Sequence, residues 1–249
     1  MIKLIKKTIH KILLIYGYEL NYIRTNLVDG KNLDRDLNII IDSTSPVCFD
    51  VGANEGQSIQ YFSKIFLEPL IYSFEPSTKV FNRLMAQYSE CNKVELFNVA
   101  LGEEKGEKVF INYKASVLSS FLALDASKEN RFRGYEVDDK EVVKIDTIDS
   151  VVETKGVERI DLLKIDTQGY DLNVLKGAEV SLRTGVVKSI FIEVNFISMY
   201  KNQSNPLEII EYLMGHNYYF VGFYEKVYQE NTMAWATALF SQRGKEYSQ

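Results

Sequence analysis

The chain of 249 residues is long enough for one sizeable hydrophobic core, and 46% hydrophobic with 25% charged residues is the composition of a soluble globular protein. The net charge of −5 argues against a protein whose main partner is nucleic acid, because phosphate binding requires a basic face. The two cysteines and two histidines lie at no zinc-binding spacing, so we expect no metal site built on them and a reducing, cytoplasmic setting.

Residues 1–44 are predicted to form a helical appendage. Ile2, Ile5, Ile9 and Ile12 recur at helical spacing, and lysines occupy the opposite face. The apolar run is too short to cross a bilayer, which takes about 20 residues. Two alternatives stay open. The helix packs across the domain with its lysines in water, which is the commoner use of such a pattern, or it makes a peripheral contact with the inner face of a membrane.

Residues 45–249 alternate strands and helices in the way that builds a parallel sheet. Strands are predicted at 47–51, 70–74, 94–99, 160–165 and 187–194, and helices at 56–66, 78–88, 172–178 and 206–214. Strands at 218–224 and 233–240 are predicted to be antiparallel. The order therefore predicts an α/β protein with a mostly parallel sheet, helices on both faces and an antiparallel C-terminal strand.

A polar segment interrupts this alternation. After an edge strand at 108–113, residues 114–140 are predicted to be an insertion over the sheet, followed by a strand at 141–145 and a short helix at 147–152. Within the insertion Lys128, Arg131 and Arg133 could hold an anionic acceptor. A solvated loop is the commoner reading of such residues.

A glycine-rich turn follows the first strand of the sheet. Asp50 ends that strand, and Gly52 and Gly56 flank Ala53 and Asn54 in the turn. Ligands in open α/β sheets bind outside the carboxyl ends of the strands, and glycine lets the backbone approach them closely. A dinucleotide fingerprint would have glycine at position 54. Asn54 therefore favours a smaller ligand with a charged amino-acid end.

The second and third strands end in polar residues that suit a nucleoside. Glu75 stands 25 positions after Asp50 and can accept hydrogen bonds from both hydroxyls of a ribose; a charge at the helix N-terminus is the alternative role. Asn98 can contact an adenine edge, or it can serve the turn there. Both readings of Asn98 stay open.

Five motifs in this order resemble the FkbM family of S-adenosylmethionine-dependent methyltransferases over roughly residues 45–242. They are Asp50-Val-Gly-Ala-Asn-Glu-Gly56, Phe74-Glu-Pro76, Asn98-Val-Ala-Leu-Gly102, Leu163-Lys-Ile-Asp-Thr-Gln-Gly169 and Leu175-Lys-Gly-Ala178. The resemblance implies a Rossmann-like class I methyltransferase fold, with S-adenosylmethionine as cofactor. It also implies methyl transfer to a hydroxyl of a sugar, a glycan or another small molecule.

The resemblance assigns the cofactor site residue by residue. Asp50, Gly52, Asn54 and Gly56 would surround the methionine part, Glu75 would hold the ribose, and Asn98 with Ala100 would border the adenine. Ala53 and Pro76, inside the same motifs, are also expected to bind the cofactor.

Asp166, at the end of the strand predicted at 160–165, is the candidate catalytic residue. It could take the proton of the acceptor hydroxyl, orient the acceptor or bind a divalent metal; capping the next helix is the alternative. Glu193 and Asn195 are weaker candidates, and Asp166 with Glu193 could supply two oxygen ligands to a metal that no motif supports. His216 is predicted to be a turn residue at a helix end rather than a base.

Two other functions compete with methyl transfer. An NAD-dependent oxidoreductase would use the same fold, although Asn54 counts against a pyrophosphate. A non-catalytic binding module would be expected to have lost the glycines or acids of the turn, and here they are present. A nucleic-acid acceptor is disfavoured by the net charge and because Asp166-Thr-Gln-Gly169 stands where such enzymes carry an Asn/Asp-Pro-Pro-aromatic motif.

Overall fold

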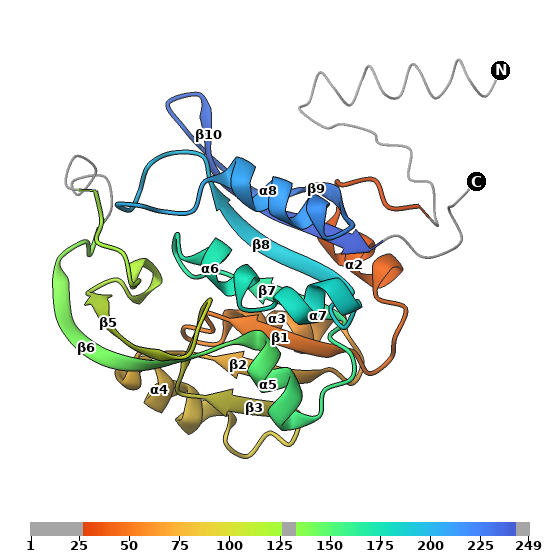
Figure 1. Cartoon of the computed structure of the whole chain (residues 1–249), viewed down its shortest axis with the longest axis horizontal. Helices are drawn as coiled ribbons and strands as arrows, with labels where there is room; N and C mark the ends of the chain where they lie inside the picture. The colour runs from red at the N-terminus through yellow and green to blue at the C-terminus, as the bar shows by residue number, and fades with distance from the viewer. Residues whose placement is uncertain (1–26, 126–132, 243–249) are drawn as a thin grey trace, which may run out of the picture.

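A seven-stranded sheet with strand order β3-β2-β1-β7-β8-β10-β9 forms the centre of the computed structural model, which describes residues 27–125 and 133–242 (Figure 1). Neighbours are parallel among β3 (Val94–Phe97), β2 (Leu70–Phe74), β1 (Val47–Val51), β7 (Leu162–Ile165) and β8 (Ser189–Asn195). β10 (Thr232–Gln242) is antiparallel both to β8 and to β9 (Tyr218–Gln229). The α/β fold with a mostly parallel sheet and an antiparallel C-terminal strand is confirmed.

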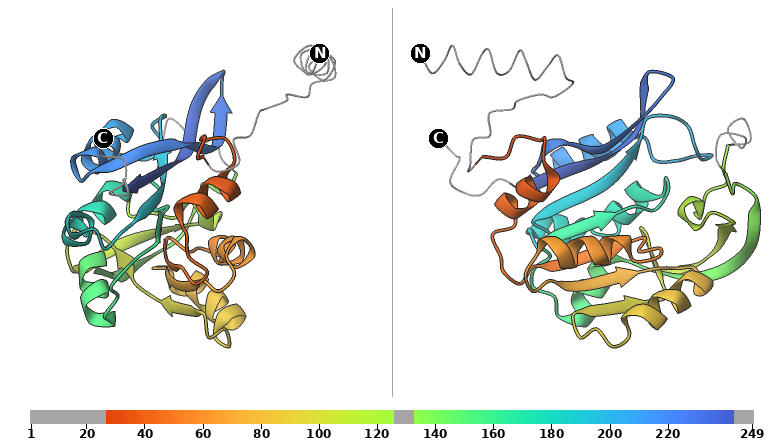
Figure 2. Two further views of the ribbon diagram at one scale, coloured as in Figure 1. Left: turned by 90° about the vertical axis from the view of Figure 1, so that its right-hand side faces the viewer. Right: turned by 180° about the vertical axis from the view of Figure 1, so that it is seen from behind.

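Helices cover both faces of this sheet (Figure 2). One face carries α2 (Leu33–Ile40), α3 (Gln57–Ile65) and α4 (Thr78–Tyr88), and the other carries α5 (Ile148–Lys155), α6 (Asp171–Lys176), α7 (Glu179–Thr184) and α8 (Pro206–Gly215). In β1, Cys48 packs into the core under α2, α3 and α4, and Phe49 packs into the core under α5 to α8. Burial on both faces explains why β1 is a continuous apolar run.

The polar segment after β3 builds a second, three-stranded sheet. β4 (Ala100–Leu101) and β5 (Gly106–Tyr113) flank β6 (Val137–Asp146), and the one-turn helix η1 (Ser116–Leu118) follows β5. β6 begins four residues earlier than the predicted strand at 141–145, because its acidic first half also pairs with β5. Its Asp138 forms an ion pair with Lys79 of α4.

A buried carboxylate ties the N-terminal part of the described chain to the sheet. Within the segment predicted to be an N-terminal appendage, α2 begins at Leu33 and its N-cap is Asn32. Asp36 of α2 is fully buried and accepts hydrogen bonds from the Gly30 N–H at 2.9 Å and the Tyr224 hydroxyl at 2.7 Å. The predicted helix near residues 2–16 lies outside the described residues. In the part of the chain that is described, no helix has the length and hydrophobicity needed to cross a bilayer.

Replacing Tyr224 by phenylalanine should lower the free energy of unfolding by about 2 kcal/mol, because a buried carboxylate loses a hydrogen-bond donor. Tyr228→Phe on the same strand is the matched control, since Tyr228 is 59% exposed, and it should change stability by less than about 0.5 kcal/mol. Urea unfolding followed by circular dichroism measures both. Equal losses in the two variants would mean that the Asp36 contact contributes nothing.

Candidate active site

The carboxyl ends of β1, β2 and β7 border a cleft of about 640 Å³, a volume that includes the open space at its mouth. η1 and the segment after it form the opposite wall, through Ser116, Val117, Ser119 and Phe121. Six residues predicted for the site line this cleft: Gly52, Asn54, Glu75, Pro76, Ala100 and Asp166. Parallel strands thus bring together residues that are more than 100 positions apart in the chain.

Four other predicted site residues support the cleft from behind. Asp50 is fully buried in β1, and Ala53 belongs to the core beneath α3. Gly56 is the N-cap of α3. The Asn98 amide donates to the carbonyls of Glu75 and Pro76, both at 3.0 Å, and so joins the ends of β2 and β3.

Gly52 is required by the close approach of two strand ends. Its φ is +81°, and a Cβ built on it would lie 2.0 Å from the carbonyl oxygen of Asp166. Because that oxygen belongs to the backbone, no rotamer change could make room for a side chain. The glycine therefore lets the turn after β1 rest directly on the end of β7.

Glu75 presents a buried carboxylate to the cleft. Its two oxygens accept the backbone N–H groups of Asn54 and Ser77, each at 2.8 Å. Burial raises the pKa of Glu75 to about 7, against the opposing effect of these two hydrogen bonds. The carboxyl group therefore titrates near neutral pH and can accept further hydrogen bonds when ionised.

Asn54 supplies a polar atom that has no partner. Its φ is +45°, in the left-handed region, and its side-chain Oδ1 is buried without a hydrogen-bond partner among the described residues. Asn54 lines the cleft, and a buried acceptor left unpaired costs about 1–3 kcal/mol. A ligand with an N–H donor would satisfy it.

A buried ammonium group links the three strand ends. Lys164 of β7 places its Nζ 3.0 Å from the Gly52 carbonyl, 3.1 Å from Asp50 Oδ1 and 3.7 Å from Asp166 Oδ2. The pKa of Lys164 is raised, because the attraction of Asp50 and Asp166 outweighs burial, which alone would lower it. The sequence analysis did not single out Lys164, and a lone lysine inside an apolar strand was the available signal.

Asp166 is held in place without being enclosed. Its side chain is 36% exposed, and its Oδ1 accepts a hydrogen bond from Gln168 Nε2 at 2.8 Å. The same Gln168 group lies 3.3 Å from Glu193 Oε1, which also accepts from Asn195. Burial, with Asp166 and Asp171 nearby, raises the pKa of Glu193 well above its ordinary value. Over 27–125 and 133–242, no group of three or more His, Cys, Asp or Glu could hold a metal ion.

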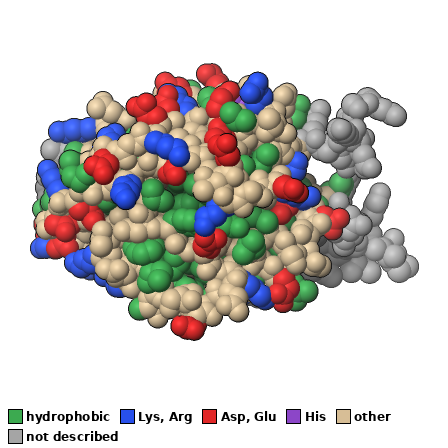
Figure 3. All heavy atoms as spheres, turned by 60° about the horizontal axis from the view of Figure 1, so that its bottom comes forward, with side chains coloured by type: hydrophobic (Ala, Val, Ile, Leu, Met, Phe, Trp, Pro, Cys, Tyr) green, Lys and Arg blue, Asp and Glu red, His purple; other side chains and the backbone are tan. Residues whose placement is uncertain are grey.

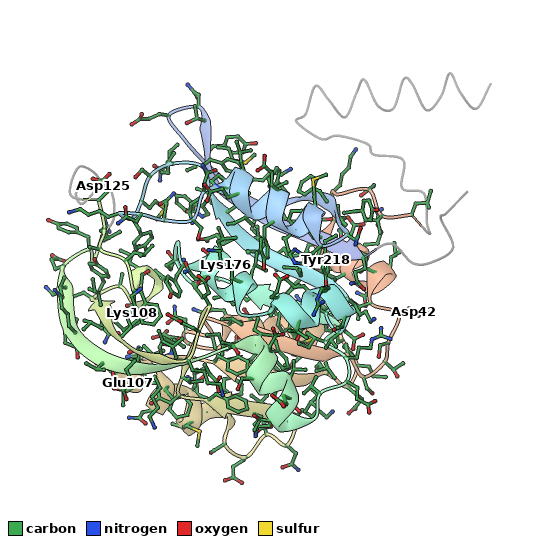
Figure 4. All side chains as sticks on the ribbon, viewed as in Figure 1. Asp42, Glu107, Lys108, Asp125, Lys176 and Tyr218 are labelled. Atoms are coloured by element: carbon green, nitrogen blue, oxygen red, sulfur yellow. The ribbon has the colours of Figure 1, made fainter. Side chains whose placement is uncertain are left out.

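The other end of the cleft is aromatic. Phe110, Phe121 and Tyr170 line it, and the rings of Phe121 and Tyr170 meet at 4.9 Å between centroids with an interplanar angle of 60°. Lys108 Nζ lies 4.7 Å from the Tyr170 centroid; Figure 4 labels Lys108 on β5. Sequence analysis missed these rings. Phe121 lies in the polar insertion, which shows no period that would orient it. Phe110 lies in the strand predicted at 108–113 and Tyr170 follows Gly169, and neither pattern indicates that the two rings meet at one cleft.

The remaining candidates lie elsewhere. His216 is the C-cap of α8, as predicted, with its Nε2 3.0 Å from Glu179 Oε2. Lys128 and Arg131 fall outside the described residues, whereas Arg133 lies in a turn.

Comparison with known proteins decides the family. The profile described as the methyltransferase FkbM domain matches residues 50–220, which span β1 to β9 and hold every predicted site residue. The chain belongs to the FkbM methyltransferase family. As an FkbM methyltransferase it uses S-adenosylmethionine, and the NAD-dependent alternative is set aside.

Two curated relatives are methyltransferases by name. The 2-O-methyltransferase NoeI of Sinorhizobium fredii is 23% identical over 182 residues, which cover 71% of this chain and 74% of NoeI. The methyltransferase sdnD of Sordaria araneosa is 27% identical over 160 residues, 55% of this chain and 61% of sdnD. Among solved structures, M. capricolum TrmK with S-adenosyl-homocysteine gives a TM-score of 0.47 at 10% identity, covering 83% of this chain and 67% of that one.

The residues of the cleft fit S-adenosylmethionine. Glu75 can accept from two ribose hydroxyls, and the aromatic end suits a flat base. The unpaired Oδ1 of Asn54 suits the amino group of the methionine part. Because Gly52 has no Cβ, the turn that carries Asn54 can lie directly against the end of β7.

Binding of S-adenosylhomocysteine should weaken as the pH falls through 7, because a proton on Glu75 competes with the ribose hydroxyls for the carboxylate. With a pKa of about 7 for Glu75, the dissociation constant should be about tenfold higher at pH 6 than at pH 8. Isothermal titration calorimetry measures it. The glutamine of Glu75→Gln cannot titrate, so this variant should bind weakly at both pH values. If the wild-type dissociation constant is the same at pH 6 and pH 8, the assignment of Glu75 to the ribose is wrong.

Proposed function

We propose that this FkbM methyltransferase transfers a methyl group to a hydroxyl oxygen of a sugar, a glycan or another small molecule. The observation that carries the proposal is the position of Asp166, a partly exposed carboxylate on the wall of the cofactor cleft. A carboxylate can accept the proton that a hydroxyl loses on methylation. The relationship to NoeI, named as a 2-O-methyltransferase, supports an oxygen acceptor.

The chemistry requires alignment and one proton transfer. When bound, S-adenosylmethionine supplies a methyl carbon on a sulfonium sulfur. Asp166 would take the proton of the acceptor hydroxyl as that oxygen receives the methyl group, and the electron pair of the broken carbon–sulfur bond would stay on sulfur. Lys164, 3.7 Å from Asp166 Oδ2, and Gln168, which donates to Oδ1, hold the carboxylate in position. Glu75 would hold the ribose of the cofactor, and the turn at Gly52 would hold its methionine part.

A small-molecule or carbohydrate acceptor fits the charges better than a nucleic acid does. The net charge of −5 gives little attraction for phosphates. On the face shown in Figure 3, acidic and basic side chains are interspersed around a hydrophobic centre rather than gathered into a basic patch. A cytoplasmic location is part of the proposal and is supported by the two cysteines, Cys48 and Cys91, which are both free.

Asp166→Asn should lower kcat for methyl transfer by a factor of about 100 or more, because the amide cannot accept the proton. The dissociation constant for S-adenosylhomocysteine should change by less than about threefold, since the amide retains the hydrogen-bonding shape of the side chain. Transfer of labelled methyl groups to a panel of sugars measures kcat.

Asp146→Asn is the matched control for this experiment. Asp146 ends β6 with a side chain 32% exposed and pairs with Lys105 outside the cleft. Its amide variant should keep kcat within about twofold of wild type. Activity of Asp166→Asn at the level of this control would exclude Asp166 as the base. Calorimetric binding of NAD in place of S-adenosylhomocysteine would overturn methyl transfer altogether.

A further inference from the structure

A second cleft opens on the other side of Asp166. It encloses about 770 Å³, open space at its mouth included, between α3, β7, β8 and the C-terminal strands. Asp166 lines both this cleft and the cofactor cleft. A molecule in the second cleft could therefore bring a hydroxyl to the same carboxylate that faces the bound cofactor.

Carboxyl and hydroxyl groups predominate among the polar side chains that line the second cleft. Its carboxyl groups are Asp166, Glu193 and Glu225, and the hydroxyls of Ser58 and Thr237 stand beside them. Among the described residues of the lining the one cation is Lys164, which is already paired with Asp50. Tyr61 and Phe191 add aromatic rings. Carboxylates accept from hydroxyls and ammonium groups, and rings pack against the C–H faces of a sugar.

A bulge in β9 directs Glu225 toward this cleft. Trp235 pairs with Val227 and Thr237 pairs with Tyr224, so β9 carries one residue more than β10 over this interval. Glu225, inside the bulge, has a φ of +49°, a backbone conformation that residues other than glycine rarely adopt. The Thr237 hydroxyl donates to Glu225 Oε2 at 2.9 Å and fixes the carboxylate.

We propose that this second cleft, lined by Asp166, Glu193 and Glu225, binds the methyl acceptor, and that the acceptor is an uncharged or amino sugar rather than an acidic one. The inference rests on the proposed function, because Asp166 is the group that the two clefts share. Glu225, held by Thr237, is the specificity-determining residue: it attracts hydroxyl or ammonium donors and repels a carboxylate or phosphate on the acceptor.

Three methyl glycosides that differ in charge test this proposal: a neutral hexoside, its 2-amino-2-deoxy analogue and its uronic acid analogue. Methyl transfer from labelled S-adenosylmethionine gives kcat/KM for each at pH 8. The neutral or the amino sugar should exceed the uronic acid by at least about tenfold. Glu225→Gln should narrow that ratio by at least about threefold, and Thr237→Val should raise KM for the preferred sugar.

An acceptor could reach Asp166 through the second cleft or through the cofactor cleft beside η1. A variant in the cofactor cleft separates these two routes. Val117 of η1 lines the cofactor cleft and is 54% exposed, so an acceptor that enters beside η1 would contact it. Val117→Ser should leave the sugar KM unchanged. Glu225→Gln and Thr237→Val should bind S-adenosylhomocysteine within about twofold of wild type, because neither residue lines the cofactor cleft.

The results test separately the route of the acceptor, the class of acceptor and the proposed function. A KM that responds to Val117→Ser and not to Glu225→Gln or Thr237→Val would overturn the second cleft as the acceptor site. Preference for the uronic acid, or no methylation of any of the three sugars by protein that binds S-adenosylhomocysteine, would overturn the acceptor class and leave the cofactor assignment standing. If the wild-type protein does not bind S-adenosylhomocysteine, the proposed function itself is refuted.

Discussion

The ion pair between Lys164 and Asp50 is the contact on which the arrangement of the site depends. Both side chains are buried on the α3 face of the sheet, on adjacent strands in register. Removing one partner of a buried pair commonly costs about 3–5 kcal/mol, because the other charge is left uncompensated. The same ammonium group contacts the Gly52 carbonyl and lies near Asp166. One cation thus holds the cofactor turn and the candidate base at a common position.

Around this pair the site divides into two chemical halves. Towards β4 and β5 the walls are aromatic, and burial is strong enough to bring the pKa of Glu75 to about 7. Towards β8 and β10 the walls carry carboxyl groups, and Glu193 and Asp166 share the hydrogen-bond donor of Gln168. The first half suits a flat base and a ribose. The second suits an acceptor rich in hydroxyls, with Asp166 on the boundary.

Sequence patterns predicted what depends on local periodicity and missed what depends on contacts between distant segments. The strand at 70–74 and the helix at 78–88 have the predicted bounds, because a buried run and a regular amphipathic pattern mark them. The role of Lys164 was missed, since its partner Asp50 lies on another strand. Glu225 was missed for a related reason: its direction depends on a bulge that forms only when β9 pairs with β10. Six of the predicted site residues line one cleft because their motifs lie at neighbouring strand ends of the sheet.

The hydrogen bond between Tyr224 and Asp36 joins residues that are 188 positions apart in the chain. A ribosome makes a protein from its N-terminus, so α2 is complete long before β9 exists to receive it. Until then Asp36 lacks the hydroxyl of Tyr224, and the core cluster around Leu37 lacks Tyr224 and Leu239. β9, which is synthesised after β1 to β8, therefore completes the docking of the first described helix. A chain released early would leave that helix exposed to proteases and chaperones.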